Sequence, residues 1–157
     1  MAAAGEKIID QLGKWPAGQE GEFRAAEGDL QVRVKMSEAG RAGCLLETVE
    51  LKSTRGSFSL DPIRVEKEVN CLPEPLRIVE LKKHQGRAVL RSFPPRTVNG
   101  MVSFFEMVID RTDGLSLGRV AHNRKLGTRS PTPALLTRET LERLVADLVS
   151  LASNGPQ

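Results

Sequence analysis

The sequence predicts an α+β fold: a mostly antiparallel sheet of six or seven strands with a short N-terminal helix and a long C-terminal helix packed on it. Apolar residues alternate with polar ones in several segments of the middle of the chain, Gly and Pro turn signals separate these segments, and one stretch near the C-terminus repeats its apolar residues at helical spacing. With 157 residues, 39% of them hydrophobic and 27% charged, the chain has the size and composition of one globular domain, 1–157.

The N-terminal helix is predicted at about 5–13, because Ile8 and Leu12 are one helical turn apart and Gly13 and Pro16 follow as stop signals. The first residues show no basic segment followed by an apolar one, and no apolar run approaches the length of a membrane span. We therefore expect a cytoplasmic protein with no membrane partner.

The sheet region is predicted at about 22–122. Alternation of apolar and polar residues makes 29–36 the first strand, and a glycine-containing connection leads to 44–52, which we expect to complete a hairpin. A further strand is expected within 58–69, although Asp61-Pro62 interrupts this segment.

A second hairpin is predicted from 76–82 and 87–93, of which the first segment is also compatible with one or two helical turns. The longest apolar run, 101–110, is predicted as a strand, because Val, Phe and Ile favour extended backbone and turn residues flank the run. A helix is the alternative for so short a run. We expect the strand to pair with 115–122. Because both of its faces are largely apolar, each needs cover from a helix, from more sheet or from a partner.

The segment 123–136 contains a glycine and two prolines and is predicted as a crossing loop. The C-terminal helix is predicted at 137–153, with Thr137 as its N-cap and an apolar stripe along one side. An apolar stripe requires a surface to pack on, and we expect the strand at 101–110 to provide it.

The common catalytic signatures are missing from the sequence, since it has no GxSxG, no GxxxxGK[ST] and no GxGxxG between a strand and a helix. The only two histidines, His84 and His122, and the only two cysteines, Cys44 and Cys71, have spacings that match no compact metal site. We predict free thiols, as in a reducing compartment, with a disulfide between Cys44 and Cys71 as the alternative, and no catalytic residue, metal or cofactor.

Glu106 lies in the middle of the apolar run, where a buried carboxylate is costly unless it is paired. As a buried acid it would act as a general base or as an anchor for a cationic ligand. As a structural residue it would pair with an arginine such as Arg91 or Arg119, or stand exposed. We favour the structural interpretation.

Charge is unevenly distributed along the chain, whose net charge is +3. From Lys82 to Arg129 the sequence has ten Lys or Arg and three acidic residues, whereas 20–81 has nine basic and twelve acidic residues. If the second hairpin and the crossing loop lie together, their basic side chains form a surface for phosphates or nucleic acid. The candidate residues are Arg87, Arg91, Arg119, Arg124, Lys125 and Arg129. Phe93 is the only aromatic residue in these two segments, which is few for stacking bases.

One short pattern in the basic region combines two arginines with a turn. Arg87-Ala-Val-Leu-Arg91 followed by Asp110-Arg-Thr112-Asp-Gly114 resembles the RxxxR and [DN]xSxxG pattern of PilZ domains, which bind cyclic di-GMP. The chain has Thr in place of Ser, lacks the second glycine, has a shorter spacing, and is predicted to turn helical where that barrel continues. We therefore do not assign the chain to that family.

A helix, a sheet and a second helix carry no function by themselves. Our leading hypothesis is a noncatalytic cytoplasmic domain that binds protein, as an adaptor or chaperone-like domain, and uses the sheet or a helix flank to bind a partner or a second copy. The alternative is the binding of an anionic ligand, nucleic acid or phosphate, through the Arg-rich face. An enzyme using Glu106 ranks third, because no second catalytic group can be placed beside it, and we lean against an enzyme.

Overall fold

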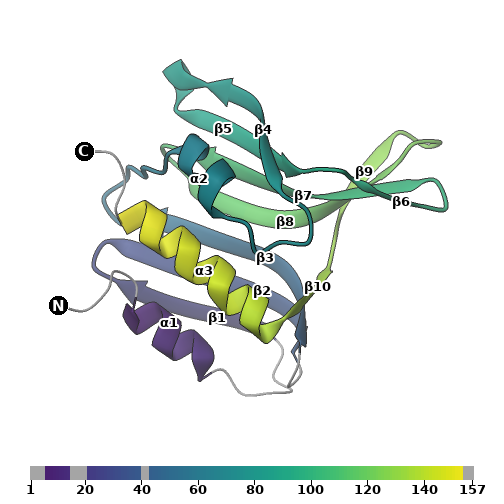
Figure 1. Cartoon of the computed structure of the whole chain (residues 1–157). Helices are drawn as coiled ribbons and strands as arrows, with labels where there is room; N and C mark the ends of the chain where they lie inside the picture. The colour runs from purple at the N-terminus through teal and green to yellow at the C-terminus, as the bar shows by residue number, and fades with distance from the viewer. Residues whose placement is uncertain (1–5, 15–20, 40–42, 154–157) are drawn as a thin grey trace.

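A computed structural model describes residues 6–14, 21–39 and 43–153 of the chain. Within these residues the fold is α+β, with ten strands in one antiparallel sheet, three α-helices and one 3-10 turn (Figure 1). The predicted fold class is confirmed, with more strands than the six or seven expected. The composition of 16–21 also predicts a loop; 16–20 falls outside the described residues, and Gly21 begins a strand.

The helices lie at both ends of the chain and in the middle: α1 (Glu6–Gly13), α2 (Pro62–Glu68), the 3-10 turn η1 (Lys83–Gln85) and α3 (Arg138–Ser153). The strands are β1 (Gly21–Glu27), β2 (Leu30–Ala39), β3 (Gly43–Ser53), β4 (Leu76–Lys82), β5 (Arg87–Ser92), β6 (Arg96–Val98), β7 (Met101–Asp110), β8 (Gly114–Asn123), β9 (Thr128–Thr132) and β10 (Ala134–Thr137).

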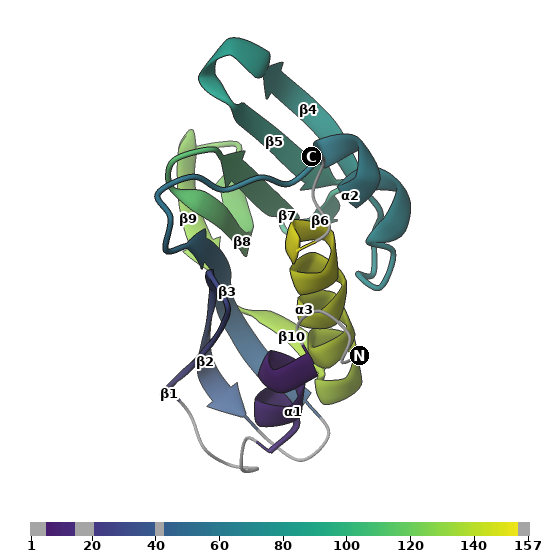
Figure 2. The same ribbon diagram turned by 90° about the vertical axis from the view of Figure 1, so that its left-hand side faces the viewer.

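The sheet runs in the order β1-β2-β3-β8-β7-β5-β4, and the three helices lie on one side of it (Figure 2). The face that carries the helices is called the inner face below, and the opposite one the outer face. Residues that alternate along each strand point to these two faces in turn. On β2, for example, Val32, Val34 and Met36 are buried while Gln31 and Lys35 are exposed, as the sequence predicts.

The sheet forks between β3 and β8. These strands pair only at Val49–Leu51 with Leu115–Leu117, and then diverge near Gly118, where a β-carbon would lie 2.9 Å from the carbonyl oxygen of Glu47. Each branch acquires a new neighbour, because β9 pairs with β8 and β10 pairs with β3. The segment 123–136, which we expected to be a crossing loop, therefore contains strands that pair with both branches.

One branch projects from the body as an arm, which we define as residues 96–103 and 119–132 (Figure 1). The arm consists of β6, the first part of β7, the last part of β8, and β9. The two-residue turn between β6 and β7 has φ of 51° at Asn99 and 80° at Gly100. Two left-handed residues are what a tight hairpin turn requires, and Asn-Gly is the pair that adopts them most readily.

The segment 58–69 contains a helix in place of the expected strand. We expected a strand there, and the structure has α2, whose first turn uses the residues that interrupt the strand pattern. The Asp61 carboxylate accepts a hydrogen bond from the Ile63 N–H at 3.0 Å, and Pro62 occupies the first helical position, where a missing N–H costs nothing.

The core lies between the inner face and the helices. Phe105 and Met107 of β7 belong to it, as do Leu144 and Leu148 of α3. Thr137 caps α3 as predicted, since its hydroxyl oxygen accepts a hydrogen bond from the Thr140 N–H at 3.0 Å. The main neighbours of α3 are β3, β10, α1 and α2 rather than β7, on which we expected the helix to lie. In the described part of the chain, no helix is both long enough and apolar enough to cross a membrane.

Candidate functional site

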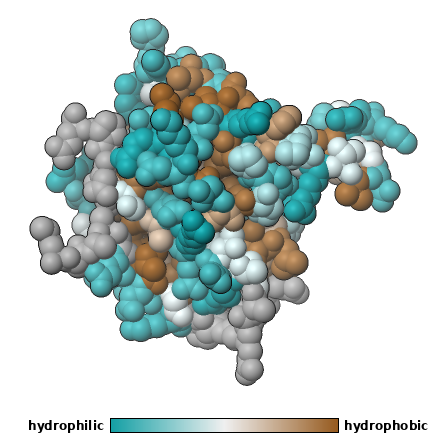
Figure 3. Space-filling view, viewed as in Figure 1, coloured by the Kyte–Doolittle hydropathy of each residue, from teal (hydrophilic) through white to brown (hydrophobic). Residues whose placement is uncertain are grey.

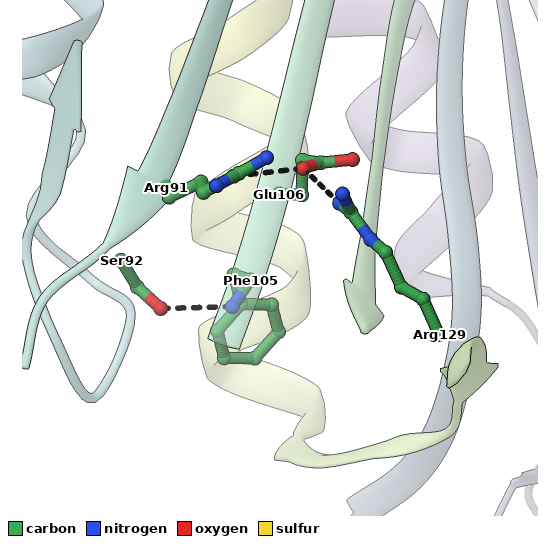
Figure 4. A network of polar contacts seen from close by, with 5 residues as sticks. All are labelled: Arg91, Ser92, Phe105, Glu106 and Arg129. Atoms are coloured by element: carbon green, nitrogen blue, oxygen red, sulfur yellow. Dashed lines mark hydrogen bonds and ion pairs between the residues drawn. The ribbon is translucent and has the colours of Figure 1, made fainter. Parts of the chain in front are cut away.

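Glu106 is held by two arginines on the outer face of β7 (Figure 4). Its Oε2 accepts a hydrogen bond from Arg91 Nε at 2.9 Å and a second one from Arg129 Nη2. Arg91 lies directly opposite on β5, whereas Arg129 reaches the carboxylate from β9. The Glu106 side chain is 19% exposed, so the carboxylate is partly shielded from water and carries two cationic partners.

These arginines also cover the apolar part of the outer face. The guanidinium carbon of Arg91 lies 5.1 Å from the centre of the Phe104 ring, and that of Arg129 lies 5.7 Å from it. Cations stacked on an aromatic ring gain electrostatic energy and shield the ring from water. The outer face of β7, apolar in sequence, is therefore covered at Phe104 by the ion-paired arginines.

Arg119 points to the inner face and does not join the other candidate arginines. It pairs in register with Phe105 and stacks over that ring at 5.7 Å, and its Nη2 donates a hydrogen bond to Ser103 Oγ at 2.7 Å. Partial burial lowers the pKa of Arg119, and nearby Arg96 lowers it further. Arg96 itself is paired with Glu74.

Arg87 lies on β5 directly opposite Asp110, at the other end of the strand pair from the arm. The N–H groups of Asp113 and Thr112 donate hydrogen bonds to the Asp110 carboxylate and, with the help of Arg87, lower its pKa. The six predicted anion-binding residues therefore do not converge on one site. Arg91 and Arg129 lie on the outer face at Glu106, Arg119 on the inner face, Arg87 beside Asp110, and Arg124 and Lys125 in the β8–β9 turn.

Arg124 and Lys125 occupy that turn, at the end of the arm, and both are exposed. Asn123 builds the turn: its side-chain oxygen accepts hydrogen bonds from the N–H groups of Lys125 and Leu126, at 3.0 and 3.2 Å, and its carbonyl accepts one from Gly127 at 2.8 Å. Leu126 is 73% exposed. The turn thus presents two basic side chains and one large apolar side chain on an ordered backbone.

Sequence reasoning missed a groove of about 550 Å³ that is lined by none of the arm residues. It lies between the start of α2, the preceding segment 57–61, and the ends of β4 and β5; we call it the α2–β4 groove. Its apolar lining residues are Phe58, Leu60, Ile63, Leu81, Ala88 and Ile109. Hydrophobic surface gathers between α2 and the β4–β5 hairpin in the space-filling view (Figure 3).

Two of these residues stand out because large apolar side chains are seldom left open to water together in one hollow. Ile63 is 52% exposed and Leu81 is 43% exposed, whereas the other apolar lining residues are buried. Three basic residues, Lys83, Arg87 and Arg111, also line the groove. Ile63 and Leu81 are distant in sequence and lie in different kinds of element, so no local pattern brings them together.

The edge of the sheet beside the groove is partly closed. β4 is an edge strand, and its Ile78 N–H donates a hydrogen bond of 2.7 Å to the Glu66 carboxylate of α2. The β4–β5 register then shifts at Val79, where the strand bulges. Capped backbone groups and bulges are devices that keep edge strands from pairing with other chains.

Cys44 and Cys71 are free thiols, and burial raises the pKa of both. His84 belongs to η1 and His122 to β8 in the arm. In the ranges 6–14, 21–39 and 43–153, no three His, Cys, Asp or Glu side chains are grouped as the ligands of a metal ion would be. Comparison of the chain with models of protein families, with curated proteins and with solved structures finds no match.

Proposed function

We propose that this protein is a noncatalytic binding domain that holds an apolar segment of a partner protein, flanked by acidic residues, in the α2–β4 groove. The observation that carries the proposal is the pair of half-exposed side chains, Ile63 and Leu81, in a hollow of about 550 Å³. This volume is within the range typical of ligand pockets.

Burial of the exposed halves of these two side chains supplies the driving force. Full burial of an Ile or Leu side chain contributes about 1.5–3 kcal/mol, so covering the remaining half of each contributes roughly 1 kcal/mol. The floor of the groove is already buried and apolar, with Phe58 and Leu60 6% exposed and Ala88 3% exposed. A partner side chain placed there would be shielded from water on several sides.

The basic residues that line the groove indicate which residues should flank the apolar part of the partner segment. Lys83, Arg87 and Arg111 bring three positive charges to the lining, and the one acidic residue of the lining, Asp61, already accepts the hydrogen bond that caps α2. Complementary potentials across an interface select partners and speed their association. We therefore expect Asp or Glu beside the apolar residues of the bound segment.

The partner is bound by its side chains rather than as an added strand. Strand addition requires a row of available backbone groups along an edge. On β4 the Ile78 N–H is occupied by Glu66 and the strand bulges at Val79. The two free thiols suit a reducing compartment, and the proposal accordingly places the protein in the cytoplasm.

Selection from a displayed library of random peptides, with the full chain as bait, tests the proposal. The matched variant is Ile63→Ser/Leu81→Ser, which removes the two exposed side chains and spares the buried floor. We expect selected peptides to combine Leu, Ile, Phe or Met with neighbouring Asp or Glu. Their affinity should fall roughly 30-fold in the variant, which corresponds to the loss of about 2 kcal/mol.

Leu135→Ser is the control, because Leu135 is 74% exposed on β10, outside the groove. This variant should bind the selected peptides as the wild type does. Peptides that bind the wild type and Ile63→Ser/Leu81→Ser equally would refute the proposal. A concentration-dependent dimer that light scattering detects in the wild type and not in the double variant would also refute it, by making a second copy the occupant.

A further inference from the structure

We infer that the arm binds duplex nucleic acid, with its basic side chains on the phosphates and its end in a groove of the duplex. This site is separate from the α2–β4 groove and does not depend on the function proposed for it. The inference rests on the charge of the arm, on the distribution of that charge over both faces, and on the apolar side chains at its end.

The arm is strongly basic and carries no acidic residue. Its two segments, 96–103 and 119–132, contain five Arg or Lys and no Asp or Glu: Arg96, Arg119, Arg124, Lys125 and Arg129. Glu74 and Glu106, outside the arm, pair with Arg96 and Arg129. Three positive charges, those of Arg119, Arg124 and Lys125, remain beyond these two pairs. Phosphate contacts of this kind dominate affinity for nucleic acid.

The charges lie on both faces and at the end of the arm. Arg129 is on the outer face with Glu106, Arg119 is on the inner face with Ser103, and Arg124 and Lys125 are in the end turn. Arg119 to Asn123, the part of β8 within the arm, corresponds to about 13 Å of strand. A groove of a duplex has phosphates along both walls. Because Arg91 and Arg129 share the single carboxylate of Glu106, the outer face keeps one net positive charge, opposite that of Arg119 on the inner face, and the arm is complementary to such a groove.

The end of the arm is built from two neighbouring hairpins, β6–β7 and β8–β9, whose turns lie side by side because Met101 pairs with Asn123. The strands β6, β7, β8 and β9 are paired side by side in one layer of sheet, which is about 10 Å thick and can enter the major groove, roughly 12 Å wide, edge on with its two faces toward the groove walls. Leu126 is 73% exposed and Val98 is 65% exposed at this end. In the major groove, exposed apolar side chains of this kind can contact the methyl groups of thymine bases.

An anionic lipid surface is the other partner with the chemistry to attract a basic end with apolar side chains. Such a surface is flat and would contact Arg124, Lys125 and Leu126 at the end only. Arg119 and Arg129, which point to opposite faces further along the arm, would not reach it together. The distribution of charge therefore favours the duplex.

The test is fluorescence anisotropy of a labelled DNA duplex of about two helical turns, titrated with the full chain at 50 and at 200 mM salt. Three phosphate contacts predict a slope of log K against log salt of about −2.7, that is, affinity that falls roughly 40-fold over this range. In Arg124→Ala/Lys125→Ala the slope should shrink by about 1.8, because two contacts are lost.

Lys35→Ala/Lys52→Ala is the matched control, since it removes two exposed positive charges from the β2–β3 hairpin, away from the arm. We expect this variant to keep the wild-type slope. Equal weakening in the two double variants would mean that net charge alone drives binding, and would overturn the inference. No binding at 50 mM salt would overturn it too, as would binding to phosphatidylserine-rich vesicles without binding to the duplex.

Discussion

Glu106 shows how a single residue joins separate segments of this chain. The carboxylate pairs with Arg91 of β5 and with Arg129 of β9, and the two guanidinium groups cover Phe104. Sequence reasoning named Arg91 as a possible partner, because the two strands are expected neighbours. It did not name Arg129, since that contact depends on β9 pairing with β8, and nothing local in 128–132 predicts a strand.

Replacement of Glu106 by Gln tests this network. The variant keeps the shape of the side chain and removes its charge, which leaves two half-exposed arginines close together without an acidic partner. We expect the free energy of unfolding to fall by about 1–2 kcal/mol, more than an exposed ion pair contributes and less than a fully buried one. Denaturant titration measures the change.

Glu80→Gln is the control for that measurement, because Glu80 forms an exposed ion pair with Lys82. Its effect should stay below about 0.5 kcal/mol. Equal effects of the two substitutions would contradict the structural importance assigned to the Glu106 network.

At the scale of elements, the strands that were predicted best are those in which the order of apolar and polar residues follows which side chains are buried. β2, β3, β5 and β7 each alternate or concentrate apolar residues, and each lies where it was expected. The segment 58–69 was misread because Asp61-Pro62 was taken only as an interruption of a strand. The same dipeptide is a helix N-cap followed by proline at the first helical position, and that signal predicts α2.

The strands β9 and β10 were missed for a different physical reason. They are short, and β9 contains Pro131 and has no buried residue. Their extended conformation comes from the edges that open where the sheet forks at Gly118, which is a property of tertiary structure. The preference of a residue type for the extended conformation depends on tertiary contacts more strongly than its preference for the helix does.

The contact between α2 and the edge strand makes a prediction at this scale. Glu66→Ala removes the carboxylate that accepts the Ile78 N–H and so exposes the edge of β4. We expect the free energy of unfolding to fall by about 1 kcal/mol, and light scattering to rise as the protein is concentrated, because an exposed edge pairs with other chains.

Glu68→Ala is the matched control, because Glu68 lies on the same helix. Among the ion pairs of the described residues, Glu68 forms one with Arg64, one helical turn away. An i,i+4 pair of this kind contributes a few tenths of a kcal/mol. If Glu68→Ala aggregates as much as Glu66→Ala does, loss of surface charge rather than exposure of the edge is the cause.

At the scale of the whole molecule, the two proposed binding surfaces come from features that the sequence shows only in part. The excess of basic residues between Lys82 and Arg129 is visible by counting, but the faces to which they point follow from strand register. The α2–β4 groove is not visible at all, because Ile63 and Leu81 become neighbours only when α2 packs beside β4. Sequence reasoning thus predicted the class of function that we propose, without the surface that supports it.

The central claim is that a partner segment occupies the α2–β4 groove, and a proton–nitrogen correlation NMR titration of the full chain with a selected apolar–acidic peptide tests it most directly. We predict saturable shifts concentrated in 57–63, 81–88 and 109–111, the segments that line the groove. Saturable shifts concentrated instead on the outer face of β1–β3 or on the arm would contradict the claim.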